Sequence, residues 1–279
     1  MARTIAQKLT ESWGQQVIVE NRPGANGIIG GEAVARAKPD GYTLLLGVPS
    51  AITMNQFVYK QMPYDPLRDL TAVSQTATNT FGLVVTRSLP VSSVKGLVAL
   101  AASRPGELLY ASAGIANQTH LAGELFARAV TIKMVHVPYK GSTPAWTDLI
   151  SGQVALMFTS TQGVTGHVKS GKLRLLATLG SKRASAFPAV PTVVESGYPG
   201  VVITGWTGLF APAGTPPDIV AKLSREVARI LADPEVRARM AADGAEPTSS
   251  SPEAFTAFIK AEAEKWSRVI RAAGLENSQ

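Results

Sequence analysis

The chain has 279 residues, of which 45% are apolar and 17% charged, a composition typical of a folded globular protein rather than a disordered one. It contains no cysteine, which excludes disulfides, iron–sulfur clusters, thiolate zinc sites and cysteine nucleophiles. The net charge is +7, but the basic residues are spread along the chain and form no cluster with aromatic residues, which favours a small anion over nucleic acid as the partner.

The first elements in chain order predict a helix and then one β-α-β unit. Residues 5–13 are expected to form the end of a helix that stops at Gly14. A β-branched run at 17–19, a helical stretch at 28–37 and an apolar strand at 42–46 follow it. Open parallel sheets bind ligands beyond the carboxyl ends of their strands, so the loops after Val19 and Leu46 are the first candidates for a site.

The middle of the chain alternates between expected strands and helices, after a helical stretch at 50–59 and a turn-rich connection at 62–70. The strands are expected at 81–86, 108–112, 133–137, 154–158 and 173–178. The helices are expected at 93–102, 118–130, 143–151 and 165–169. Strands that alternate with helices in this way predict a second parallel sheet with covering helices.

The end of the chain and its length together predict two domains. An extended segment is expected at 201–210. Two amphipathic helices follow it, the first from residue 216 or 217 to 231 and the second at 252–273. A chain of this length favours two domains, and the strand at 81–86 and the return near Gly205 resemble crossings between two lobes. The first lobe is then expected from residues 1–78 and 206–279, and the second from 79–205. Two crossings form a hinge, and we expect a ligand in the cleft between the lobes.

One segment, residues 110–114 (Y-A-S-A-G), is a degenerate nucleophile elbow and suggests a serine-dependent hydrolase that uses Ser112. The first glycine of that motif is missing, and the general base would have to be His120, His136 or His167. The sequence places no acid behind any of these histidines. Ser112 could instead contact an anion, because a hydroxyl and free N–H groups at a helix N-terminus attract carboxylate or phosphate.

The sequence predicts neither a metal site nor a cofactor. Three scattered histidines without cysteine do not form a spaced set of ligands, and acidic residues are sparse in the central region. The loop Tyr139-Lys140-Gly141-Ser142 after an expected strand is a second possible anion loop. The alternative interpretation is that Lys140 is solvated and that Gly141 and Ser142 begin a helix.

Several segments resemble one family, the Bug-type receptors, which are the extracytoplasmic solute-binding proteins of tripartite tricarboxylate transporters. The segments follow the family's order over nearly the whole chain, and they include V-I-V-E-N-R-P-G-A-N-G, K-P-D-G-Y-T-L-L-L-G, Y-A-S-A-G-I-A-N-Q-T-H, V-P-Y-K-G-S-T-P-A and G-W-T-G-L-F-A-P-A-G-T-P. The resemblance implies an α/β, two-lobed periplasmic-binding-protein fold (Venus flytrap, type II) without catalysis. It also implies a periplasmic location, a small mono- or dicarboxylate ligand, and permease subunits in the membrane as partners.

The resemblance also implies where the ligand binds. The loop after Leu46 would contribute Gly47, Val48 and Ser50, and the loop that opens the helix at 118 would contribute Ser112, Gly114, Asn117 and Gln118, together with Thr159. The family often has aspartate where Ala155 and Thr159 stand. An acid that could pair with an ammonium group is therefore missing, and we expect ligands with an amino group to bind more weakly than plain dicarboxylates.

The start of the sequence differs from the family pattern. Family members usually begin earlier, with a signal peptide, a first strand and a glycine-rich loop, whereas this sequence begins inside the first helix, near Met1. The resemblance then implies a first lobe without its usual N-terminal strand. The periplasmic location rests on the resemblance alone, because the given sequence shows no signal peptide. A truncated remnant that binds no ligand is the remaining alternative.

Overall fold

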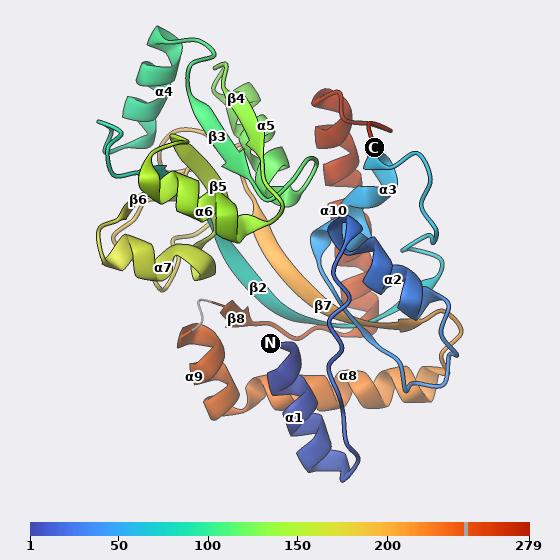
Figure 1. Ribbon diagram of the computed structural model, residues 1–279. Helices are drawn as coiled ribbons and strands as arrows, with labels where there is room; N and C mark the ends of the chain where they lie inside the picture. Colours follow the sequence, from blue (N-terminus) through green and yellow to red (C-terminus); the bar gives the residue numbers. More distant parts are fainter. Residues whose placement is uncertain (243–244) are drawn as a thin grey trace. The chain divides into compact units, whose positions relative to one another are not determined.

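The computed structural model describes residues 1–242 and 245–279, which form two compact units (Figure 1). Unit 1 consists of Met1–Thr78 and Trp206–Gln279, and unit 2 of Asn79–Gly205. The chain passes from one unit to the other inside a strand each time, in β2 (Leu70–Thr86) and in β7 (Thr204–Pro212). None of the helices in the described ranges is long and apolar enough to span a bilayer.

Unit 1 is a small sheet with helices on both faces. Its further elements are α1 (Ala2–Trp13), η1 (Ala25–Gly27), α2 (Ile28–Ala35), β1 (Leu45–Gly47), η2 (Ser50–Met54), α3 (Asn55–Val58), α8 (Pro217–Ala232), α9 (Pro234–Ala242), β8 (Ala245–Pro247) and α10 (Pro252–Ala272). Strand β1 pairs antiparallel with β7, and β2 pairs with both β7 and β8. Helix α10 begins where the Ser251 hydroxyl caps the Ala254 N–H, with Pro252 in the first turn.

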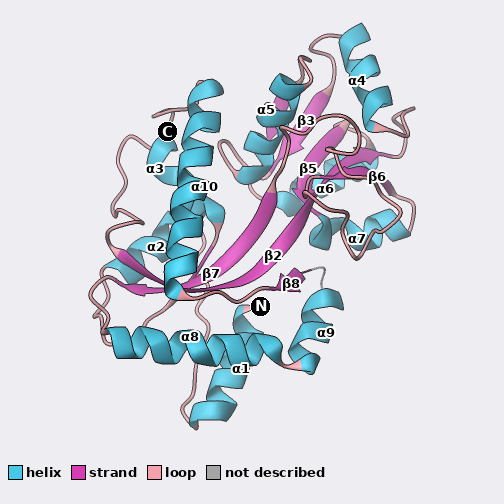
Figure 2. Ribbon diagram, turned by 180° about the vertical axis from the view of Figure 1, so that it is seen from behind, coloured by secondary structure: helices cyan, strands magenta, loops and turns pink. Residues whose placement is uncertain are grey.

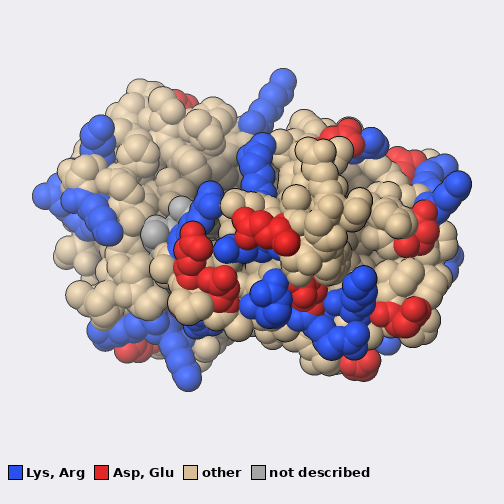
Figure 3. All heavy atoms as spheres, turned by 90° about the horizontal axis from the view of Figure 1, so that it is seen from below, with Lys and Arg blue, Asp and Glu red and all other residues tan. Residues whose placement is uncertain are grey.

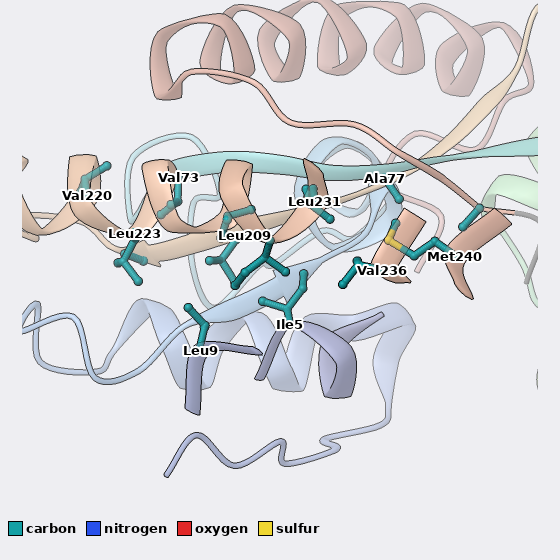
Figure 4. Packing of buried hydrophobic residues seen from close by; sticks show 14 residues of the cluster. Ile5, Leu9, Val73, Ala77, Leu209, Val220, Leu223, Leu231, Val236 and Met240 are labelled. Atoms are coloured by element: carbon teal, nitrogen blue, oxygen red, sulfur yellow. The ribbon is translucent and has the colours of Figure 1, made fainter. Parts of the chain in front are cut away.

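Successive side chains of β7 point to opposite faces of this sheet, and different helices cover the two faces (Figure 2). Leu209 belongs to the cluster that contains Ile5 and Leu9 of α1 and Leu223 of α8, as Figure 4 shows. Its neighbour Phe210 belongs to a second cluster, with Phe255 and Ile259 of α10. Each face of the short sheet is therefore buried under an amphipathic helix.

Unit 2 is a mixed sheet with helices on both faces. Its elements, besides parts of β2 and β7, are α4 (Val94–Ser103), β3 (Leu109–Ser112), α5 (Gln118–Ala129), β4 (Val135–Pro138), α6 (Ser142–Ser151), β5 (Leu156–Ser160), α7 (Thr161–Lys169) and β6 (Leu173–Thr178). Strand β3 runs parallel to β4 and β5, whereas β2 runs antiparallel to β5 and β6. Met157 of β5 packs with α6 and α7, while Phe158 contacts Phe126 of α5.

Two predictions about the sheets are wrong. Residues 17–47 form no β-α-β unit, because Val17–Val19 lies outside the strands: the Val17 N–H donates to the Thr10 hydroxyl, and the Ile18 side chain is 79% exposed. The second strand of that unit is Leu45–Gly47, and it pairs antiparallel. The expected parallel sheet of the middle region is mixed, because β2 enters it from unit 1 in the antiparallel direction.

Candidate functional site

The loop between β3 and α5 in unit 2 carries most of the site residues expected from the sequence. Strand β3 ends at Ser112 opposite Pro138 of β4, and α5 begins at Gln118. The N–H groups of Tyr139 and Gly141 donate to the carbonyl groups of Ser112 and Ala113, at 3.0 and 3.1 Å. These bonds fix the loop against the segment that follows β4.

Most N–H groups of this loop are already used inside it. The Ala113 N–H donates to the Thr119 hydroxyl, the Gly114 N–H to the Ser112 hydroxyl and the Asn117 N–H to the Gly114 carbonyl. Asn117 also caps α5, because its side-chain oxygen accepts the Thr119 N–H at 3.1 Å. The loop is therefore a self-supporting turn rather than an open row of donors.

Two amides at the start of α5 remain available. The N–H groups of Gln118 and His120 donate to no acceptor within residues 1–242 and 245–279. They belong to the first turn of the helix, where N–H groups lack intrahelical partners and the helix dipole favours negative charge. The site therefore offers two neutral donors suited to a carboxylate. Gln118 was predicted from the sequence, whereas the amide of His120 was not, because only the hydrogen-bond pattern identifies it.

Ser112 lies inside a buried polar cluster. Its side chain is 0% exposed, and its hydroxyl oxygen lies 2.6 Å from Nε2 of His136, 3.0 Å from the Gly114 carbonyl and 3.1 Å from the Gly114 nitrogen. The His136 ring on β4 stacks against the His120 ring of α5, with centroids 3.7 Å apart and planes at 8°. Burial lowers the pKa of both histidines to about 4, so both are neutral at neutral pH.

An acid lies beside this cluster, which corrects the sequence analysis. Glu124 Oε1 is 3.8 Å from Nε2 of His120 and accepts a 2.6 Å hydrogen bond from the Tyr110 hydroxyl. The acid faces His120, however, whereas the partner of Ser112 is His136. A hydrolytic triad needs nucleophile, base and acid in one chain of hydrogen bonds. This arrangement instead divides them between two stacked rings.

Thr159 lies at the same edge of the unit 2 sheet as Ser112, because β3 and β5 are parallel and both residues are near the carboxyl ends of their strands. It is 1% exposed, and its hydroxyl accepts the indole N–H of Trp146 at 3.3 Å. The Gln118 side chain is also engaged, since its amide donates to the Thr204 carbonyl at 3.1 Å. Five predicted residues of unit 2 thus lie on one loop and one neighbouring strand end.

The other three predicted residues lie in unit 1, between β1 and η2. A Cβ on Gly47 would come within 2.7 Å of the Phe210 ring, so only glycine fits there. Val48 is 39% exposed, and the Ser50 hydroxyl makes no hydrogen bond to the part of the chain that the structure describes. Asn55, which follows η2, is buried and leaves Oδ1 without a donor among the described residues. No sequence motif predicted a role for it.

The described side chains bring no three histidine or acidic residues close enough to hold a metal ion. The donors in both loops are backbone amides, hydroxyls and carboxamides, which are neutral hydrogen-bonding groups. The arrangement can bind an anion through hydrogen bonds, and the named site residues include no lysine or arginine for an ion pair.

Comparison with known proteins identifies relatives over nearly the whole chain. The model of the tripartite tricarboxylate transporter family receptor matches residues 1–275. Protein BugT of Bordetella pertussis is 40% identical over 275 residues, which cover 98% of this chain and 84% of that protein. A UPF0065 protein from the tcbD-tcbE intergenic region of a Pseudomonas strain is 36% identical over 271 residues, 97% of this chain and 80% of the relative.

Solved structures give the same result for the fold. Rpa4515 of R. palustris with adipate has a TM-score of 0.91 and 37% identity, covering 98% of this chain and 91% of that one. MatC from Rhodopseudomonas palustris with bound malate has a TM-score of 0.86 and 30% identity, covering 96% and 92%. The periplasmic binding protein BugD has a TM-score of 0.87 and 34% identity, covering 99% and 92%. The fold is therefore that of the two-lobed periplasmic solute-binding proteins.

Proposed function

The chain belongs to the tripartite tricarboxylate transporter receptor family, and from this premise we propose that it is a periplasmic receptor for a small organic carboxylate. It would deliver that carboxylate to the permease subunits of a tripartite transporter and catalyse no reaction. The observation that carries the proposal is the pair of unpaired amides, Gln118 and His120, at the start of α5. Two unpaired N–H donors in the first turn of a helix suit the two oxygens of a carboxylate.

The ligand class follows from the family and from the chemistry of the loops. Two structural relatives carry adipate and malate, which are both dicarboxylates. We extend this class to the present chain, and the proposed ligand-binding residues of unit 2 are Ser112, Gly114, Asn117, Gln118 and Thr159. Of these, Gln118 contacts the ligand through its backbone, while Ser112 and Gly114 shape the loop. Gly47, Val48 and Ser50, at the junction of β1 and η2 of unit 1, are further proposed ligand-binding residues.

One substitution tests the amide of Gln118 without disturbing the helix. Gln118 is the first residue of α5, where proline is favoured, and Asn117 before it has the extended conformation (φ −68°, ψ 158°) that a following proline requires. Gln118→Pro therefore removes the N–H donor, and Gln118→Ala, the matched control, removes only the side chain. Losing a hydrogen bond to a charged group costs about 1.5–3 kcal/mol, so we expect about ten- to 100-fold weaker carboxylate binding by the proline variant than by the alanine variant.

Isothermal titration calorimetry and thermal shift with mono-, di- and tricarboxylates measure this effect. A ligand at 100 times its dissociation constant should add about 2.7 kcal/mol to the unfolding free energy. Malate should bind more tightly than aspartate, which carries an amino group, because Ala155 and Thr159 supply no acid. Failure of the wild type to bind any carboxylate would contradict the proposal. Equal affinities of the proline and alanine variants would contradict the role of the amide.

The alternative of a serine hydrolase has one observation in its favour, the 2.6 Å distance between the Ser112 hydroxyl and His136. Against it, Ser112 is fully buried, and its hydroxyl also lies within hydrogen-bond distance of the Gly114 carbonyl. Ester turnover by the wild type that disappears in Ser112→Ala would establish the hydrolase. A receptor shows no turnover in either protein.

A further inference from the structure

We propose that His120 and His136 are positioning residues, which hold the β3–α5 loop in the conformation that leaves the amides of Gln118 and His120 available to the ligand. This inference rests on the proposed function, because it concerns the same carboxylate site. It assigns to the two imidazole rings a role in affinity although neither ring needs to touch the ligand.

His120 fixes the end of the loop. Its Nδ1 accepts the N–H of Ala116 at 2.9 Å. Ala116 is 1% exposed and has φ 55°, in the left-handed region that residues with a side chain rarely adopt. Without the Nδ1 acceptor, a buried N–H would lose its partner at a backbone position that is already unfavourable. The loop would then relax, and the first turn of α5 follows directly after it.

His136 fixes the beginning of the loop. Its Nε2 contacts the Ser112 hydroxyl at 2.6 Å, and the same hydroxyl accepts the Gly114 N–H at 3.1 Å. The parallel register places His136 beside Tyr110 of β3, two residues before Ser112. Because the rings of His120 and His136 stack at 3.7 Å, the two ends of the loop are supported by one rigid pair.

The pair works only while both rings are neutral. A protonated His120 cannot accept the Ala116 N–H, and two imidazolium rings stacked at this distance would repel each other. The titratable groups that face the pair are Tyr110 from β3, whose ring stacks on His136 at 5.0 Å, and Glu124 from α5, 3.8 Å from His120. Tyr110 is neutral and donates its hydroxyl to Glu124, whose negative charge only partly offsets burial.

Two substitutions at His120 distinguish the effect of the Nδ1 acceptor from the effect of the ring. His120→Asn retains an acceptor at the place of Nδ1 but does not titrate, whereas His120→Leu fills the space without an acceptor. His167→Leu, on α7, is the control for loss of a histidine elsewhere. Calorimetric titration with adipate and with malate at neutral pH should show at least about tenfold weaker binding for His120→Leu than for His120→Asn, since a buried N–H is left unpaired. His167→Leu should bind like the wild type.

A pH series gives a readout that mere structural support would not change. Protonation of the ligand itself affects both proteins equally, so it does not change the ratio of wild-type to His120→Asn affinity. This ratio should fall about twofold between neutral pH and pH 4, where about half of the wild-type His120 is protonated. This measurement does not require that the leucine variant folds.

The outcomes distinguish this inference from the proposed function. If the wild type binds neither adipate, malate nor any other carboxylate, the proposed function fails and this inference fails with it. If the wild type binds but His120→Leu binds equally well, or the affinity ratio does not change with pH, only the positioning role is overturned. A folded His120→Leu variant with weak binding, together with the pH-dependent ratio, supports the role.

Discussion

The Tyr110 hydroxyl connects the buried histidine pair to its only acidic neighbour among the described residues, Glu124, through a 2.6 Å hydrogen bond. Tyr110 is 1% exposed, and burial, together with the hydrogen bond to Glu124, raises its pKa. Tyr110→Phe removes the donor and should lower the free energy of unfolding by about 1–2 kcal/mol, because a hydrogen bond to a charged acceptor is lost. Urea denaturation measures the change. Tyr42→Phe, at a side chain that is 92% exposed, is the matched control and should have no effect.

The histidine pair also predicts how stability depends on pH. Both pKa values fall from 6.5 to about 4 on folding, so the unfolded chain binds more protons between these values. The free energy of unfolding should therefore have its full value above about pH 6.5 and decrease as the pH falls toward 4. Denaturation series at several pH values measure this slope. The slope should be smaller in the double variant His120→Asn, His136→Gln, and an equal slope would contradict the assignment.

The sequence predicted the loop between β3 and α5 but not the side chains that support it. Ser112, Gly114 and Asn117 were identified because a strand, small residues and a helix cap follow one another in the chain. The stacking of His120 on His136 depends on the parallel register of β3 and β4, which local sequence does not encode. The roles of Ser112, Gly114, Asn117 and the other predicted site residues stay predictions.

Helix α10 packs so closely on β7 that one added methyl group should lower the stability of the fold. A Cβ on Gly208 would come within 2.0 Å of the Phe255 ring, which is 0% exposed and packed against Trp206 and Phe210. Gly208→Ala should lower the free energy of unfolding by about 1–3 kcal/mol through overpacking. The control is Gly166→Ala inside α7, where a Cβ meets nothing within 4 Å and alanine should stabilise the helix by about 0.5–1 kcal/mol. Chemical denaturation of both variants tests the contrast.

The elements found from the sequence are those with a strong period or a cap. The apolar stripes of α8 and α10 predicted helices where the structure has them, and of the two predicted caps for α4, Ser92 or Ser93, the structure has Ser93. Helix α9 was missed because it is short and presents little more than Val236 and Met240 to the core. The first part of β2 was missed because its buried residues include Ser74, Gln75 and Thr76, which do not resemble a strand core.

For the whole molecule, the family resemblance and the periplasmic-binding-protein fold predicted from the sequence are confirmed. This prediction depended on the order of the motifs: together, motifs spaced from residue 17 to residue 216 identify the family even though one segment, Val17–Val19, was assigned the wrong local structure. The carboxylate cannot be read from side chains because the unpaired donors, the amides of Gln118 and His120, belong to the backbone. Every residue except proline supplies the same backbone N–H, so the side chains do not reveal which amides bind.

The net charge of the whole molecule predicts how carboxylate binding depends on salt. Lysine and arginine side chains are interspersed with acidic ones on the face shown in Figure 3, with an overall charge of +7. Such a surplus attracts a dianion over a long range, and the Debye length shrinks from about 30 Å at 0.01 M to about 3 Å at 1 M salt. The association rate of adipate should therefore fall roughly two- to fivefold over this range.

The dissociation rate should respond differently, because none of the proposed site residues carries a charge. Once bound, the carboxylate is held by neutral donors at short range, which salt screens little. Stopped-flow measurement of both rates separates the two effects, and a monocarboxylate, with half the charge of adipate, should show a weaker dependence of its association rate. A dissociation rate that rises with salt as steeply as the association rate falls would instead indicate a lysine or arginine in direct contact with the ligand, and would contradict a site built from the α5 amides.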